Sequence, residues 1–82
     1  MKGIITSINQ NRGMFAIQTA SGYSIAELLS GEDIDLGDEL QWNGTSPLGD
    51  TEVRNITKDE KFSIYFQNHE VSAANLYQQL LF

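Results

Sequence analysis

The chain has 82 residues, no cysteine and a formal net charge of −6, so it forms one small domain without disulfides or thiolate metal sites. This acidic balance disfavours a polyanion partner at long range, because phosphate binding draws on clustered Lys and Arg, although one face can still be locally basic. No apolar run has the roughly 20 residues of a membrane span or the pattern of a signal peptide, so we expect a cytoplasmic protein with no membrane partner.

The first third of the chain predicts strands. Residues 3–8 and 14–19 read as a hairpin joined by the polar turn Asn9–Gly13. The segment Tyr23–Ile25 predicts a short third strand, and Ala26–Ser30 a helical turn.

Two further strands follow a polar, acidic connection at Gly31–Glu39. The segments Leu40–Trp42 and Glu52–Ile56 alternate between apolar and polar residues, as half-buried strands do. Between them, Asn43–Asp50 is rich in Gly, Ser and Pro and predicts a surface loop.

The last third predicts an ordered strand and helix. Phe62–Phe66 alternates with period two, and Gln67–Glu70 reads as a polar turn. Ser72 is a good helix N-cap, with Val71 and Leu76 at the positions of a hydrophobic staple. The apolar residues that then recur at helical spacing are Ala73, Leu76, Tyr77, Leu80 and Leu81.

Five short strands within about 60 residues indicate an all-β fold, a small five-stranded OB-type Greek-key barrel. We expect this barrel to comprise residues 1–58. Residues 59–82 would form a C-terminal strand plus helix addition, packed on the barrel or on a partner subunit.

The opening stretch G-I-I-T-S-I-N-Q-N-R-G-M-F-A-I, residues 3–17, resembles the bacterial cold-shock domain pattern G-x-V-K-W-F-N-x-x-K-G-F-G-F-I without a gap. The residues kept or conservatively replaced are Gly3, Ile5, Asn9, Arg12, Gly13 and Ile17. Residues 37–42 and 53–58 are similar to the family's later G-x-x-V-x-F and A-x-N-V-T-K segments. The resemblance, which ends near residue 58, implies an OB barrel that binds single-stranded RNA or DNA.

In that family, aromatic side chains on one sheet face stack on bases. The matching positions here hold Ser7, Ile8, Met14, Ala16 and Ser24. Each stack contributes ~1–3 kcal/mol, so losing four forfeits at least ~4 kcal/mol, about a thousandfold in affinity. The resemblance therefore implies weak binding, with site residues Lys2, Arg12, Met14 and Arg54.

The alternative function is a non-enzymatic protein-interaction module that uses the barrel face and the C-terminal helix. Residues Leu76, Tyr77 and Leu80 would then pack on the barrel in cis or on a second copy in a homodimer. A third hypothesis keeps nucleic-acid binding and makes Tyr65, Phe66 or Tyr77 the stacking residues.

The remaining candidates favour ordinary structural roles. The resemblance implies that Trp42 lies in the core, because the family's residue at that place faces inward, with base stacking as the alternative. His69 is predicted in a polar turn. The acidic run Glu32–Asp35, together with Asp38–Glu39, is predicted as a solvated loop, with a divalent cation as the alternative. No Ser/His/Asp constellation or phosphate loop is recognisable, so we expect no catalytic residue, metal or cofactor.

Overall fold

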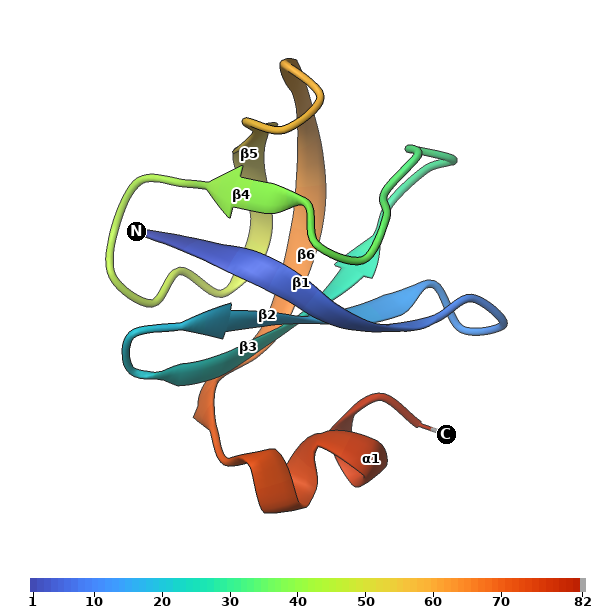
Figure 1. Cartoon of the computed structure of the whole chain (residues 1–82), viewed down its shortest axis with the longest axis vertical. Coiled ribbons are helices and arrows are strands. Elements are labelled where there is room, and N and C mark those ends of the chain that lie inside the picture. The colour runs from blue at the N-terminus through green and yellow to red at the C-terminus, as the bar shows by residue number, and fades with distance from the viewer. Residues whose placement is uncertain (82) are drawn as a thin grey trace.

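The computed structural model describes residues 1–81, which form a closed antiparallel β-barrel with a short C-terminal helix (Figure 1). The strands are β1 (Lys2–Asn9), β2 (Met14–Thr19), β3 (Gly22–Leu28), β4 (Glu39–Gln41), β5 (Gly49–Asn55) and β6 (Glu60–Val71). Their spatial order is β1-β2-β3-β6-β5-β4, with β4 returning beside β1. The order β4-β1-β2-β3 is that of a Greek key.

The barrel has six strands, so the five-stranded expectation is corrected. Strand β6 closes the barrel by pairing with β3 on one side and β5 on the other. It runs through the predicted polar turn at 67–70, and β3 continues to Leu28 through the predicted helical turn. The local sequence pattern did not predict either extension, because pairing with neighbouring strands provides the backbone hydrogen bonds there. Polar side chains such as Gln67 and Glu70 remain exposed on these strands.

The predicted β1–β2 hairpin is confirmed, with Ile5 opposite Ile17 and Asn9 opposite Met14. Strand β1 passes so close to β2 that a Cβ at Gly3 would collide with the carbonyl oxygen of Gln18. A glycine is therefore required at this crossing.

The barrel interior is filled by aliphatic and aromatic side chains. The predicted core position of Trp42 is confirmed, since it is 3% exposed and its ring centroid lies 5.0 Å from that of Phe66. The other buried residues of this core are Ile5, Phe15, Ile17, Ala26, Ile34, Leu40, Val53 and Ile64.

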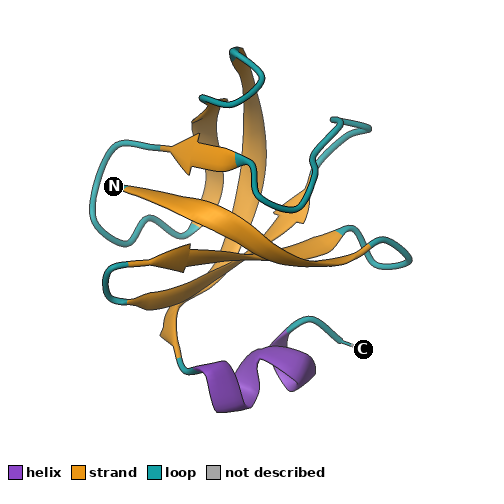
Figure 2. Cartoon of the chain, viewed as in Figure 1, coloured by secondary structure: helices purple, strands orange, loops and turns teal. Residues whose placement is uncertain are grey.

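The C-terminal segment, residues 72–81, contains a 3-10 turn η1 (Ala73–Asn75) and one α-helical turn α1 (Leu76–Gln79). It lies outside the barrel, along β2 and β3 (Figure 2). Ser72 lies at the N-cap position of η1, as predicted, and has the extended backbone of an N-cap, but its side chain makes no cap hydrogen bond. Within residues 1–81, no helix has the length and apolar character needed to cross a membrane.

Candidate binding site

The outer face of β2 and β3 is covered by the C-terminal segment. Met14 and Ala16 of β2 and Ile25 of β3 form a second apolar cluster with Val71 and Leu80, outside the barrel core. Leu80 is 1% exposed, although the segment that carries it is otherwise half-buried or exposed. The segment therefore docks in cis chiefly through this leucine.

One buried hydrogen bond fixes the docked segment. The side-chain amide of Asn9, at the end of β1, donates from Nδ2 to the carbonyl oxygen of Leu80 over 2.8 Å. Asn9 is 6% exposed, so this bond is shielded from water. Sequence reasoning placed Asn9 only in a turn, because a contact across 71 positions leaves no local signal.

The docked C-terminal segment determines which of the residues predicted to bind nucleic acid are accessible to solvent. Met14 is 5% exposed beneath the C-terminal segment, and Phe66, a candidate replacement stacking residue, is 1% exposed in the core. Tyr65 and Tyr77 are exposed. The outer face at Met14 and Ala16, two positions at which the resemblance implied base stacking, is thus occupied by the chain itself.

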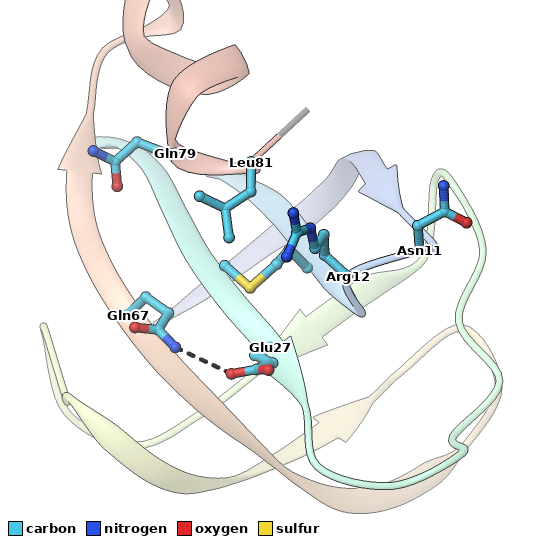
Figure 3. A pocket seen from close by; sticks show the side chains of 7 residues that line it. Asn11, Arg12, Glu27, Gln67, Gln79 and Leu81 are labelled. Atoms are coloured by element: carbon cyan, nitrogen blue, oxygen red, sulfur yellow. Dashed lines mark hydrogen bonds between the residues drawn. The ribbon is translucent and has the colours of Figure 1, made fainter.

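Beside the docked segment lies an open groove of about 470 Å³, called here the Arg12 groove (Figure 3). Its lining residues are Asn11, Arg12, Met14, Glu27, Gln67, Gln79 and Leu81. Arg12 and Leu81 extend into the groove, and the Gln67 amide donates to the Glu27 carboxylate over 3.2 Å at its edge. The groove combines a cation, a carboxylate, amides and apolar surface.

Arg12 is held by a tight turn and makes no ion pair with the described residues 1–81. The Arg12 amide donates to the Asn9 carbonyl over 3.2 Å, and Gly13 follows with a φ of 67° that favours glycine. The Gly13 carbonyl accepts the Leu28 amide over 2.8 Å, which ties the turn to β3. No carboxylate of residues 1–81 lies within ion-pair distance of the Arg12 guanidinium, so it is available to a ligand.

The other predicted binding cations lie on a different surface. Lys2 is opposite Gln41 and Gln41 is opposite Arg54, which in turn is opposite Lys61. This row, Lys2–Gln41–Arg54–Lys61, crosses the outside of β1, β4, β5 and β6 and is called the basic row. Lys2 starts β1 whereas Arg12 follows its far end, so the four predicted site residues divide between two surfaces (Figure 1).

The basic row is largely neutralised by neighbouring acids. Lys2 Nζ lies 3.9 Å from a Glu39 carboxylate oxygen, and an Arg54 guanidinium nitrogen lies 2.8 Å from Asp59. Among residues 1–81, Lys61 has no carboxylate within ion-pair distance. The row therefore has one unpaired cation and no buried charge.

The acidic connection between β3 and β4 is organised by a lysine. Lys58 Nζ lies 2.8 Å from Asp35, 3.3 Å from Asp38 and 3.8 Å from Asp33. Hydrogen bonding to Asp35, ahead of the attraction of the other carboxylates, raises the pKa of Lys58. The ammonium group thus lies among the carboxylates considered for a divalent cation, and residues 1–81 contain no cluster of metal-ligating side chains.

Asp38 is the buried member of this network. Its side chain accepts from Asn55 Nδ2 over 2.9 Å and from the Asp35 amide over 3.0 Å. Burial alone would raise the pKa of Asp38, but these hydrogen bonds together with Lys58 outweigh it and lower the pKa. Asp38 therefore remains a carboxylate that anchors the connection to β5.

His69 lies in β6, half-buried, rather than in the predicted polar turn. Its Nδ1 is 2.8 Å from Ser24 Oγ, and its Nε2 donates to the Pro47 carbonyl. Because a carbonyl only accepts, Nε2 is the donor to Pro47, and Nδ1 faces the serine hydroxyl. Ser24 is 2% exposed, so the contact joins β3, β6 and the 43–48 loop structurally; sequence could not reveal a pair 45 positions apart.

Comparison of the chain with protein-family models, with curated proteins and with solved structures finds no match. Its geometry identifies it as a small six-stranded antiparallel β-barrel, a scaffold compatible with a binding module.

Proposed function

We propose that this chain is a non-enzymatic protein-interaction module that binds an extended polypeptide segment in the Arg12 groove. One observation carries the proposal: the C-terminal segment covers the outer face of β2 and β3 and leaves beside it an open groove, whose guanidinium makes no ion pair within residues 1–81. The cover counts against base stacking on the outer face of β2 and β3, because base stacking needs exposed aromatic surface.

The chemistry of the groove suits a peptide with one acidic residue next to an apolar residue. Amides of Asn11, Gln67 and Gln79 can pair with peptide N–H and C=O groups, and Leu81 offers apolar contact. Arg12 can take a carboxylate in a bidentate arrangement, and a hydrogen bond to a charged group contributes about 1.5–3 kcal/mol. Because the chain itself has a net charge of −6, it would repel a peptide with an acidic run, so a peptide with a single carboxylate is favoured.

A second candidate function rests on the basic row. Lys2, Arg54 and Lys61 are three of the five Lys and Arg residues of the chain, and the register aligns them across four strands. With the cold-shock resemblance, this alignment favours weak, sequence-independent binding of single-stranded nucleic acid through phosphate contacts. The ion pairs of Lys2 and Arg54 count against it.

The two functions separate in a titration of ¹⁵N-labelled protein. The first probe is a pool of capped tetrapeptides with one Asp between apolar residues, and the matched control pool carries Asn in place of Asp. We expect the Asp pool at millimolar concentration to shift the amides of Arg12, Glu27 and Gln67, and Arg12→Gln to abolish these shifts. Lys61→Gln is the matched control variant and should leave them unchanged.

A mixed single-stranded oligonucleotide at low salt is the second probe. Shifts confined to Lys2, Gln41, Arg54 and Lys61 would establish the second function. Equal shifts with the Asp and Asn pools, or none with either, would contradict the proposed role of Arg12.

A further inference from the structure

We propose that two copies of this chain exchange residues 71–81, so that Val71 and the C-terminal segment of each copy cover the outer face of the other copy's barrel. In cis, Leu80 packs with Met14, Ala16 and Ile25, and its carbonyl accepts from Asn9. A second copy presents the same groups in the same arrangement. Exchange therefore preserves every contact that docks the segment, which makes it a low-cost route to a dimer.

The hinge between barrel and segment is short and strained. Strand β6 ends at Val71 and η1 begins at Ala73, so Ser72 alone separates them. Glu70 has a φ of 55°, a left-handed conformation that is unfavourable for a residue with a side chain. Glu70 lies one residue before the end of β6, so straightening the chain there removes this strain and directs Val71 together with the segment away from their own barrel. Val71 then regains its pairing with Tyr23 and its place in the apolar cluster on the other copy, and short strained hinges promote such exchange.

The segment has little structure of its own to keep it in place. Neither Ser72 nor Asn75 caps its helix with a side-chain hydrogen bond, and α1 spans only Leu76–Gln79. Isolated helices of this length are not stable in water, so the segment is ordered by the surface on which it docks. Either copy can supply that surface.

Exchange would also make the Arg12 groove a composite site. One copy would contribute Arg12, Glu27 and Gln67 from its barrel, and the other Gln79 and Leu81 from its segment. The inference does not depend on what the groove binds.

The first test measures mass by analytical ultracentrifugation after refolding at micromolar and at millimolar concentration. We expect the wild-type protein to form a dimer, and the fraction of dimer to increase with the protein concentration during refolding. Glu70→Gly, which relieves the hinge strain, should raise the dimer dissociation constant about tenfold, equivalent to ~1.4 kcal/mol. Asp59→Gly is the matched control, because Asp59 has a φ of 54° in the β5–β6 turn, away from the hinge.

The second test identifies the surface on which the exchanged segment docks. The chain contains no cysteine, so Met14→Cys and Leu80→Cys variants can be mixed, refolded together and mildly oxidised. We expect a covalent heterodimer joined through positions 14 and 80, well above that from Met14→Cys mixed with Leu36→Cys, whose residue is exposed. A monomer at every concentration, or a dimer without this enriched cross-link, would overturn the proposal.

Discussion

The docking of the C-terminal segment predicts that Leu80→Ala is strongly destabilising. Leu80 is 1% exposed in the cluster of Met14, Ala16, Ile25 and Val71, and replacing a buried leucine with alanine costs about 2–5 kcal/mol. The lower part of this range applies, about 2–3 kcal/mol, because half-buried Tyr23 and Leu76 at the cluster edge can relax into the space.

This loss is measurable by urea and thermal unfolding. For a domain of this size we expect Tm to fall by roughly 10–20 °C. The matched control is Leu81→Ala, since the neighbouring leucine is 54% exposed and should change stability by less than about 0.5 kcal/mol. Equal losses in the two variants, or no loss in Leu80→Ala, would refute the docking of the segment through Leu80.

Three further predictions concern the barrel. Gly3→Ala should destabilise the protein by about 1–3 kcal/mol in urea, because its Cβ would meet the Gln18 carbonyl and Ile17 Cγ2, whereas Gly31→Ala, with open space around it, should not. Asp38 has a folded pKa below its ordinary value of 3.8, so its contribution is present above that pH and is lost as pH falls through the folded pKa. The urea midpoint of Asp38→Asn should therefore be lower at pH 7 and vary less below pH 3.8 than that of the wild type; parallel curves would argue against the network. His69→Phe should leave Ser24 unpaired and speed amide exchange in residues 43–48, at a cost of about 1–3 kcal/mol, and unchanged exchange would show that the Pro47 contact does not hold the loop.

The sequence predicted those parts of the fold that depend on local pattern. The β1–β2 hairpin follows from two apolar runs around a glycine turn. The burial of Trp42 was expected from the cold-shock resemblance, in which the matching residue faces inward. The extent of β6 was missed because Gln67–Glu70 is locally polar, and only pairing with β3 makes it a strand.

The candidate site was harder to predict for the same reason. Arg12 was recognisable as an exposed turn cation, but its groove requires Glu27, Gln67 and Leu81 to converge from distant parts of the chain. The Asn9–Leu80 bond joins residues 71 positions apart, and the basic row appears only once strand register is known. A single sequence contains no record of such pairings.

The central claim is that the C-terminal segment excludes nucleic-acid bases from the outer face of β2 and β3. Titrating ¹⁵N-labelled wild-type protein with a mixed single-stranded oligonucleotide at low salt, and following the amides of Met14, Ala16 and Ile25, tests it most directly. We predict no shift at these three amides, whatever occurs along the basic row. Saturable shifts clustered on them would show that bases reach this face and would contradict the account.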